Sequence, residues 1–430
     1  MASKDEGAGA PSPVPGGAPR AGSSPGAPGG SGGASSGSGG SPGSGRSGRS
    51  GRSGRDGRSN DRGDRPLDRV AIIGSGNWGS AIAKVVGENA AAHSSRFEKK
   101  VRMWVFEEIV EAQKLTEIIN RQHENIKYLP GVRLPGNVVA MSDLEAVVAG
   151  ANMLVFVLPP QFLRRLLPTI RKKVQPGTRA ISLCKGILFD DEKGVVLISD
   201  MIRKGLGGGV DVSVLMGANV AAEVARGDFC EATLGYRVKS NAVAFCYAFN
   251  SPSFHVRLTN DAIGVELCGG LKTIVGIGAG ICDGLGYGGN TKAAIVRLGM
   301  VDMIRFGEVF FSGVQHSTFL ESCGVADVIA ECFGGRNRRC AEIFVRTGKS
   351  WDVVETEVLL GQKLAGTLTA ARVHALLVRD GRTDEFPFFT TVHNIAFDGM
   401  DPSMIVKQRE WDPDHHLNSL NNSGMSGGVG

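Results

Sequence analysis

Residues 70–81 read VAIIGSGNWGSA, and this stretch decides the fold of the chain. The four apolar residues at its start predict a buried parallel strand, and the small residues from Ala81 to Val86 predict a helix. Between them, Gly74 permits a sharp turn, Gly76 lets the backbone approach a pyrophosphate, and Gly79 lets the helix pack closely on the strand. The sequence therefore predicts a dinucleotide-binding turn, although the pattern also fits an ordinary tight connection between a strand and a helix.

The backbone of this turn is the predicted binding element. The first amides of the following helix have no partner within the helix, so they face the phosphates of a cofactor, where the helix dipole favours negative charge. Trp78 is unusual in such a turn, and we expect its ring to pack beneath the turn rather than against the cofactor. The predicted cofactor-binding residues here are Gly74, Ser75, Gly76, Asn77, Trp78 and Gly79.

The composition leaves room for two globular domains and argues against several other classes. The chain has 430 residues, of which 42% are hydrophobic, and no apolar run approaches the roughly 20 residues of a membrane span. Its eight cysteines include no CxxC pair, and its eight histidines show no metal-ligand spacing. We therefore expect buried thiols in a reducing compartment, with no structural zinc or other metal site, no disulfide framework and no membrane span.

The net charge of +5 lies almost entirely in the N-terminal segment. Residues 1–69 carry ten basic and six acidic side chains, so the remainder is close to neutral and gives no basis for a nucleic-acid partner. Residues 1–66 consist mainly of Gly, Ser, Pro and Arg, and we expect them to be disordered. Their Arg-Ser-Gly repeat from Arg46 to Arg58 fits either a solvated spacer or an arm that binds RNA or is regulated by phosphorylation. The segment has no apolar signal core, but an organellar targeting role stays open.

A second strand is predicted at Val101–Phe106, and it ends at two acidic residues, Glu107 and Glu108. In nucleotide-binding folds an acid at this position accepts hydrogen bonds from the ribose hydroxyls and repels a 2′-phosphate, which favours NAD over NADP. The alternative is that the two glutamates begin a helix over residues 108–119, where acidic side chains suit the first turn.

Further short apolar runs alternate with helix-like or loop segments after residue 130. This alternation is typical of a doubly wound parallel sheet of the Rossmann type. Short loops follow three of the runs, at the strand ends where ligands bind in such sheets. The runs lie at residues 138–141, 153–158, 180–183 and 212–216, and the loops at 159–162, 184–186 and 217–219.

From about Thr259 the pattern changes to helical spacing without clear strands. We therefore expect an α/β Rossmann-type doubly wound sheet plus a C-terminal all-α domain, with a disordered N-terminal tail. Helices are expected at 262–281, 291–311, 364–378 and 390–396, and a loop at 333–338. The predicted division is a tail at 1–66, an NAD-binding domain at 67–258, a helical substrate-binding domain at 259–410 and a flexible C-terminal tail at 411–430.

Several long segments extend the likeness beyond the glycine turn. They include GSGNWGSAIAKVVGENA from Gly74, KLTEIINRQHENIKYLPG from Lys114, GAGICDGLGYGGNTKAAIVRLG from Gly278 and FGGRNRRCAE from Phe333. With these segments the chain resembles the NAD-dependent glycerol-3-phosphate dehydrogenases of the eukaryotic cytosolic type. The resemblance implies reversible hydride transfer between NADH and dihydroxyacetone phosphate, a small phosphorylated substrate, to give sn-glycerol 3-phosphate. It also implies a cytoplasmic homodimer that associates through the helical domain.

The reaction needs a proton donor or a cation at the ketone oxygen, because hydride arriving at the carbon leaves charge on that oxygen. The resemblance assigns the general acid and base to Lys272, a second active-site lysine to Lys185 and an orienting aspartate to Asp327. We expect desolvation and the neighbouring cation to lower the pKa of Lys272 toward working pH. The alternative for a lysine on an apolar helix is that its ammonium reaches the surface.

The resemblance also assigns the remaining ligand contacts. Arg336 offers a planar fork suited to phosphate oxygens, and Asn337 contributes an amide donor. The alternative for such an Arg-Asn pair is a helix cap or a solvent-facing loop. For Phe106 and Phe162, which the resemblance assigns to the cofactor, the alternative is ordinary core packing. The implied substrate-binding residues are Lys185, Arg336, Asn337, Asn219 and Thr273, and the implied cofactor-binding residues beyond the glycine turn are Phe106, Phe162, Ala221, Arg336 and Lys363.

Three residues depart from the family pattern near the chemistry. Thr273 stands where asparagine is usual, Glu331 where threonine is usual, and Ala365 where glutamine is usual. A carboxylate at Glu331 repels the phosphate unless it pairs with a cation such as Arg336 or points away. We therefore expect weaker substrate or cofactor binding with intact chemistry. The alternative functions are another β-hydroxyacid-type dehydrogenase and a weakened NAD-binding regulatory protein.

Overall fold

The computed structural model describes residues 66–190 and 194–407. All described residues belong to one compact unit, the second of two into which the chain divides, with the boundary after residue 63. The predictions for the N-terminal tail, including its Arg46–Arg58 repeat, and for the C-terminal tail at 411–430 lie outside the described residues.

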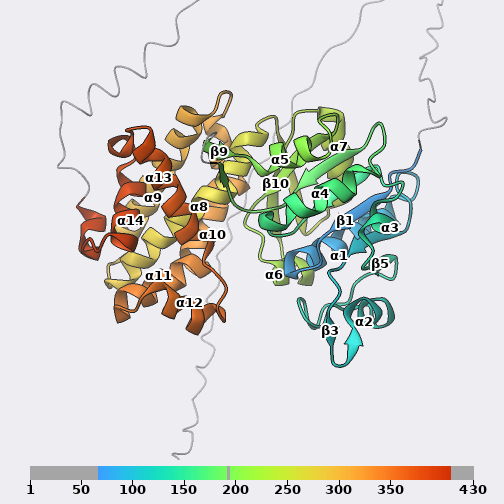
Figure 1. Cartoon of the computed structure of the whole chain (residues 1–430), viewed down its shortest axis with the longest axis horizontal. Coiled ribbons are helices and arrows are strands. Elements are labelled where there is room, and N and C mark those ends of the chain that lie inside the picture. Colours follow the sequence, from blue (N-terminus) through green and yellow to red (C-terminus); the bar gives the residue numbers. More distant parts are fainter. Residues whose placement is uncertain (1–65, 191–193, 408–430) are drawn as a thin grey trace, which may run out of the picture. The chain divides into compact units, whose positions relative to one another are not determined.

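The first half of the second unit is built on one eight-stranded sheet (Figure 1). Its strand order is β12-β11-β10-β7-β6-β1-β2-β5, and the pairings are parallel except that of β10 with β11. This order confirms the predicted Rossmann-type doubly wound sheet, because the chain builds outward from β1 in both directions. The strands are β1 (Val70–Ile73), β2 (Val101–Trp104), β5 (Val138–Met141), β6 (Met153–Phe156), β7 (Arg179–Ser182), β10 (Asp211–Met216), β11 (Cys230–Gly235) and β12 (Phe254–Thr259).

Helices cover both faces of this sheet, and side-chain alternation along β1 shows how. Ile72 belongs to one buried cluster with Ile82 and Phe245, whereas the adjacent Ile73 belongs to another with Leu167. A strand buried on both faces is apolar throughout, as the sequence of β1 is. The first cluster takes residues from α1 (Asn77–Ala92), α2 (Leu115–Gln122), α6 (Ala221–Arg226) and α7 (Lys239–Phe249), and the second from α3 (Leu144–Val148), α4 (Leu163–Arg171) and α5 (Ile198–Gly205).

The region after β2 differs from one of the two predictions made for it. A hairpin of β3 (Ile109–Val110) and β4 (Gln113–Lys114) precedes α2, so residues 108–119 do not form one helix. Glu111 and Ala112 make its turn with φ of 50° and 60°, a left-handed conformation that no α-helix contains. The alternative in which the glutamates begin a helix is therefore wrong. A second hairpin follows β7, formed by β8 (Leu188–Asp190) and β9 (Gly194–Val196).

The second half is helical, as predicted, and centres on α8 (Ala262–Gly284) (Figure 1). This helix is long and apolar enough to cross a membrane by length and composition, with a mean hydropathy of 1.5, but the apolar window is wholly buried inside the protein. Such burial is typical of the core helix of a globular domain. The surrounding helices are α9 (Gly289–Phe310), α10 (Asp327–Gly334), α11 (Arg336–Thr347), α12 (Trp351–Leu359), α13 (Ala365–Arg379) and α14 (Pro387–Phe397).

Glycines let α8 approach the sheet closely. A Cβ at Gly269 would lie 2.7 Å from Sδ of Met216, the last residue of β10, and a Cβ at Gly270 would overlap the side chain of Ile187, which follows β7. Side chains at these positions would push the helix away from the strand ends. The close approach places Lys272, which lies one turn after Gly269, beside the carboxyl ends of β7 and β10.

Several elements were absent from the sequence predictions. They are strands β11 and β12 at one side of the sheet, the β3–β4 and β8–β9 hairpins, and helices α7, α10, α11 and α12. Residues 333–338, which were expected to form a loop, contain instead the end of α10 and the start of α11, joined at Gly335. Helix α1 also runs to Ala92, beyond the expected segment.

Candidate active site

The glycine turn has the geometry that a dinucleotide requires. Gly74 adopts a φ of +123°, and a Cβ there would overlap the carbonyl of Val157. A Cβ at Gly79 would overlap the O of Gly74, whereas a Cβ at Gly76 would meet nothing within 4 Å. Gly76 is also the N-cap of α1, which no side chain caps. The turn therefore presents open space and unbonded helix amides, and both fit a pyrophosphate.

Buried side chains hold this turn in place. Asn125 is fully buried and donates hydrogen bonds to the O of Ser75 at 2.8 Å and to Oγ of Ser80 at 2.8 Å. The Trp78 ring packs edge-on against Phe254 with ring centroids 6.3 Å apart. Asn125 was not predicted from the sequence, because a lone asparagine 50 residues from Ser75 belongs to no recognisable pattern.

Two exposed aromatic rings follow strands of the same sheet. Phe106, after β2, is 68% exposed, and Phe162, after β6, is 51% exposed. Because core packing would bury these rings, the core-packing alternative is wrong for both. Ala221 is the first residue of α6, which follows β10. All three residues lie after the carboxyl ends of parallel strands, where ligands bind in doubly wound sheets.

The two acids after β2 are both engaged within the protein. Glu107 accepts hydrogen bonds from N of Thr116 at 3.2 Å and from its Oγ1 at 2.7 Å. Glu108 accepts a hydrogen bond from the Tyr128 hydroxyl at 2.7 Å and pairs with Lys127. These carboxylates organise the segment around α2, so a contact with ribose has to share their oxygens.

Two lysines and one aspartate converge where the helices meet the sheet. Lys272, midway along α8, donates to Oδ1 of Asp327 at 2.7 Å, and Lys185, in the loop after β7, donates to Oδ2 of Asp327 at 3.1 Å. Lys185 also donates to the O of Gly217, after β10, at 3.2 Å. Asp327 begins α10 and is 2% exposed. The Lys185 side chain is 36% exposed and that of Lys272 only 7%, so Lys185 is the more accessible cation.

A second carboxylate, Glu331, lies one turn further along α10. Its Oε2 is 3.2 Å from Nζ of Lys272, and its Oε1 accepts a hydrogen bond from Nδ2 of Asn337 at 2.8 Å. Asn337 in turn accepts a hydrogen bond from N of Gly366 at 2.8 Å. Glu331 therefore pairs with Lys272 rather than with Arg336, the cation considered for it in the sequence analysis. We call Lys185, Lys272, Asp327 and Glu331 the lysine–carboxylate cluster.

The pKa of Lys272 shifts in the direction opposite to the prediction. Burial lowers this pKa, but the carboxylates of Asp327 and Glu331 outweigh burial and raise it above the usual 10.5. For Lys185, burial and the neighbouring Lys272 outweigh the carboxylates, so its pKa lies below the usual value. The prediction was wrong because it counted the neighbouring cation and left out Glu331.

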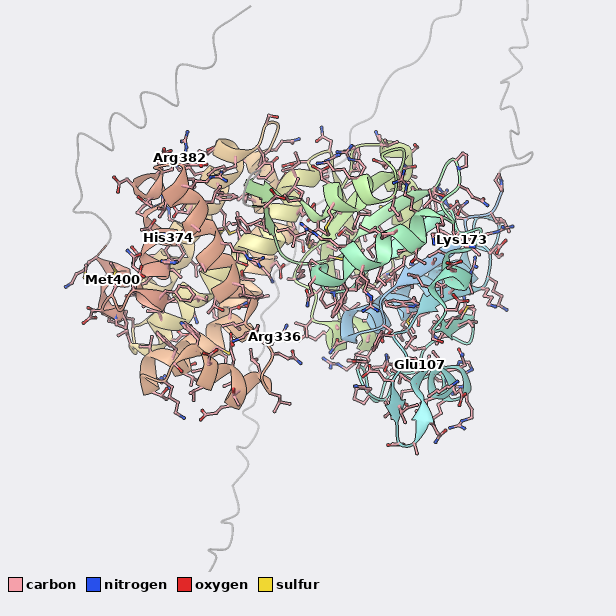
Figure 2. The ribbon with its side chains drawn as sticks, viewed as in Figure 1. Glu107, Lys173, Arg336, His374, Arg382 and Met400 are labelled. Atoms are coloured by element: carbon pink, nitrogen blue, oxygen red, sulfur yellow. The ribbon has the colours of Figure 1, made fainter. Side chains whose placement is uncertain are left out.

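Two of the predicted basic residues lie outside these hydrogen bonds. Arg336 is exposed at the first position of α11 (Figure 2). Among the described residues, no carboxylate lies within ion-pair distance of it. Lys363 pairs with Asp352 at 2.7 Å and with Glu355 at 2.9 Å. Lys363 is therefore tethered to α12, whereas the Arg336 guanidinium is available to an anion.

The remaining predicted substrate residues make local hydrogen bonds. Thr273 donates its hydroxyl hydrogen to the O of Gly270 at 2.7 Å, within α8. Asn219 donates from Nδ2 to the O of Glu231 at 2.8 Å, which fixes the loop after β10. The structure thus joins Lys185, Lys272, Asp327 and Asn337 in one network with Glu331, and leaves Thr273 and Asn219 outside it.

Two further features lie apart from this network. The His374 and His393 rings stack with centroids 3.8 Å apart and 14° between their planes, and with Asp398 they offer metal-ligand atoms within 4.8 Å of one another. Because the lone pairs of stacked rings run side by side rather than converge, we infer no metal centre there.

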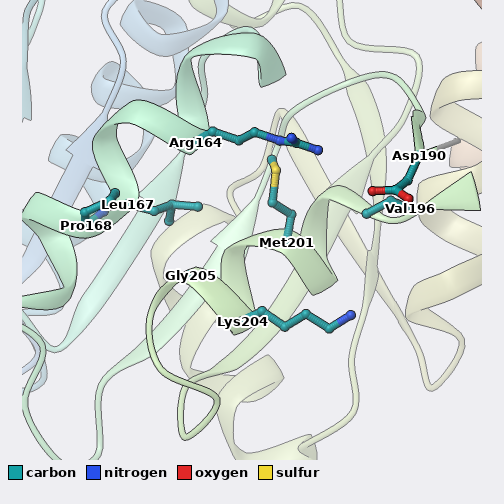
Figure 3. A pocket seen from close by; sticks show the side chains of 8 residues that line it. All are labelled: Arg164, Leu167, Pro168, Asp190, Val196, Met201, Lys204 and Gly205. Carbon is teal, nitrogen blue, oxygen red and sulfur yellow. The ribbon is translucent and has the colours of Figure 1, made fainter. Parts of the chain in front are cut away.

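A cavity of about 420 Å³ lies between α4 and α5 (Figure 3). None of its lining residues is a predicted site residue; they are Arg164, Leu167, Pro168, Asp190, Val196, Met201, Lys204 and Gly205.

Comparison with known proteins decides the family. Residues 69–242 match the family model described as NAD-dependent glycerol-3-phosphate dehydrogenase N-terminus, and residues 261–407 match the one described as its C-terminus. The chain belongs to the NAD-dependent glycerol-3-phosphate dehydrogenase family. It is therefore an NAD-dependent oxidoreductase, as the resemblance implied. In this family member the glycine turn and Lys185 lie in the N-terminal match, and Lys272, Asp327 and Glu331 lie in the C-terminal match.

Individual relatives match over nearly their whole length. The human glycerol-3-phosphate dehydrogenase 1-like protein is 50% identical over 348 residues, which span 81% of this chain and 98% of the relative. The rat protein named glycerol-3-phosphate dehydrogenase NAD(+), cytoplasmic, is 48% identical over 348 residues, with 81% and 99% covered. The solved glycerol-3-phosphate dehydrogenase of Saccharomyces cerevisiae is 40% identical with a TM-score of 0.76, covering 80% of this chain and 99% of the other.

Proposed function

We propose that this family member interconverts dihydroxyacetone phosphate and sn-glycerol 3-phosphate in the cytoplasm, with Lys272 as general acid and base. The observation that carries the proposal is the convergence of Lys272 and Lys185 on buried Asp327. It occurs at the carboxyl ends of the parallel strands, where the glycine turn also lies and where doubly wound sheets bind ligands. Bound NADH supplies a hydride for ketone reduction, and NAD accepts one in the reverse direction.

The lysine–carboxylate cluster supplies the proton and the positive charge that the substrate oxygen needs. Lys272 donates a proton to the ketone oxygen as charge develops there, and it removes that proton from the alcohol in the reverse reaction. Asp327 holds the ammonium at 2.7 Å and fixes its direction. Lys185, the more exposed cation, polarises the substrate oxygens. The raised pKa of Lys272 keeps it protonated at neutral pH, which suits ketone reduction.

The start of α11 is the proposed phosphate site. Arg336 occupies the first position of this helix, and its N-cap, Gly335, has no side chain to satisfy the first amides. A guanidinium fork and a helix N-terminus both favour a phosphate dianion. Asn337 adds an amide donor beside them, and this donor is engaged by Glu331 in the free protein.

The remaining assignments extend those inferred from the sequence. The glycine turn would hold the pyrophosphate of NAD, and the exposed rings of Phe106 and Phe162 would flank its adenosine half and pyrophosphate side. Asn219, Thr273 and Ala221 would line the nicotinamide and substrate end, and Lys363 would reach the cofactor when its segment closes. We further propose a homodimer formed through the helical half. The cytoplasmic location is supported by the name of the rat relative.

Loss of NADH absorbance on addition of dihydroxyacetone phosphate tests this proposal. We expect turnover by the wild type and a decrease in kcat of about 10²- to 10⁴-fold in Lys272→Met, the range for loss of a general acid. The matched control is Lys349→Met, which removes an exposed lysine paired with Glu357, and it should retain activity. Turnover of 2- or 3-hydroxy acids alone would indicate a β-hydroxyacid-type dehydrogenase, and NADH binding without any turnover would indicate a regulatory protein.

A further inference from the structure

Glu331 brings negative charge into the place where the proposed substrate binds. Its side chain is 11% exposed. One carboxylate oxygen lies 3.2 Å from Nζ of Lys272, and the other accepts a hydrogen bond from Nδ2 of Asn337 at 2.8 Å. The proposed function assigns the first of these donors to the ketone end of the substrate and the second to its phosphate end. A single internal carboxylate therefore spans both ends of the site.

Two glycines make room for this side chain. A Cβ at Gly276, on α8, would lie 2.7 Å from Cγ of Glu331, and a Cβ at Gly335 would overlap its Oε1. Gly335 is the N-cap of α11, so Oε1 lies against the positive end of that helix. The Glu331 carboxylate thus engages an ammonium and a side-chain amide, and lies close to a helix N-terminus, all of which an external anion would use.

The charges that face Lys272 come from two other elements. Asp327 and Glu331 face it from α10, and Lys185 faces it from the loop after β7. The charges of the two lysines and the two carboxylates cancel, whereas without Glu331 the cluster would keep one positive charge. A phosphorylated substrate brings negative charge to this cluster, so the Glu331 carboxylate weakens the attraction between the cluster and the substrate.

We propose that Glu331 is an internal competitor of the substrate: in the free protein it occupies the Lys272 ammonium and the Asn337 amide, and it must release both before the phosphate ester binds. The inference rests on the proposed function for the identity of the substrate. Its two consequences are a high KM for the ester and a Lys272 that stays protonated to higher pH than Asp327 alone would allow, because Glu331 adds a second carboxylate.

Steady-state kinetics across pH test the competition in Glu331→Gln and Glu331→Thr. We expect the KM for dihydroxyacetone phosphate to fall about tenfold in both variants. The reason is that the substrate no longer has to displace the charge-assisted contact between Glu331 and Lys272. The pH above which kcat/KM for ketone reduction declines should move lower, because kcat/KM reports the free enzyme and one of the two carboxylates that raise the pKa of Lys272 there is gone. The matched control is Glu357→Gln, which removes one exposed carboxylate on α12 and should change neither quantity.

Inorganic phosphate is a second probe that needs no turnover. Titration of the thermal unfolding midpoint with phosphate should give half-saturation at about tenfold lower concentration in Glu331→Gln than in the wild type. If the wild type fails to reduce dihydroxyacetone phosphate but this tightening occurs, the proposed function fails and the competition stands. A KM and a phosphate affinity that are unchanged or weaker in Glu331→Gln would overturn the competition and make Glu331 a substrate ligand or a structural brace. Should Glu331→Thr not fold, the isosteric glutamine variant decides.

Discussion

Replacement of Asp327 by asparagine should lower the free energy of unfolding by about 3 kcal/mol at neutral pH. Asp327 is 2% exposed and accepts hydrogen bonds from two ammonium groups, at 2.7 Å and 3.1 Å. Removal of one partner from a buried ion pair costs about 3–5 kcal/mol. The lower end applies because asparagine keeps an acceptor oxygen, Glu331 still balances Lys272, and the Lys185 side chain is 36% exposed.

The loss should shrink at alkaline pH. The pKa of Lys185 is lowered by burial and by Lys272, so the unfolded chain binds more protons at this group, and stability rises as the pH climbs from the lowered value toward 10.5. Removal of Asp327 lowers this pKa further and enlarges the effect. The raised pKa of Lys272 stabilises the wild type below 10.5, and this contribution is lost as the pH rises through the folded value. Both changes reduce the difference in unfolding free energy between Asp327→Asn and the wild type as the pH rises.

Urea denaturation at neutral and at alkaline pH measures both effects. The matched control is Asp352→Asn, which removes an exposed carboxylate paired with Lys363 and should leave the denaturation midpoint unchanged. The idea that Asp327 neutralises two lysines would be refuted if Asp327→Asn unfolded at the same urea concentration as this control at neutral pH. A deficit that grew with pH would refute it equally.

Gly76→Ala should leave the unfolding free energy unchanged, because its Cβ meets no protein atom within 4 Å. It should weaken NADH binding in a fluorescence titration, because the Cβ enters the space proposed for the pyrophosphate, and an unchanged NADH affinity would contradict this. Gly79→Ala should cost about 2 kcal/mol in urea denaturation, because its Cβ would overlap the O of Gly74; an unchanged midpoint would contradict that. Glu266, which accepts a hydrogen bond from N of Ser199, has its pKa raised by desolvation to about 7, so the wild type should lose about 3 kcal/mol of stability as the pH rises from 4.5 to 7. Glu266→Gln should remove this pH dependence, and a slope equal to that of the wild type would count against it.

The central part of the sheet was predictable because its signals are local. The apolar runs of β1, β5, β6, β7 and β10 and the glycine turn each lie within a few consecutive residues. Strands β11 and β12 were missed because polar side chains, such as Glu231 in β11 and His255 in the edge strand β12, interrupt their apolar runs. The β3–β4 hairpin was missed because its turn uses Glu111 and Ala112 at positive φ, which neither residue type indicates.

The site was predictable as a set of residues but not as an electrostatic whole. The family resemblance supplied Lys272, Lys185 and Asp327, and the structure joins them. The sign of the Lys272 pKa shift depends on where the Glu331 carboxylate points, and that is set by tertiary packing. One signal was available: Asp327 and Glu331 are four residues apart, a spacing that places both on one face of a helix. It went unused because α10 was not recognised.

Helix α8 combines the packing of the helical half with the proposed chemistry, and this limits how the protein can be redesigned. Lys272 shares the helix with Gly269, Gly276 and Gly280, each of which has a neighbour where a Cβ would go. Random mutagenesis of α8 would therefore yield mostly inactive clones, whatever substrate was sought. A library aimed at altered specificity should instead vary the exposed side chains around the start of α11, where Arg336 lies, because new side chains there would leave the packing around α8 unchanged.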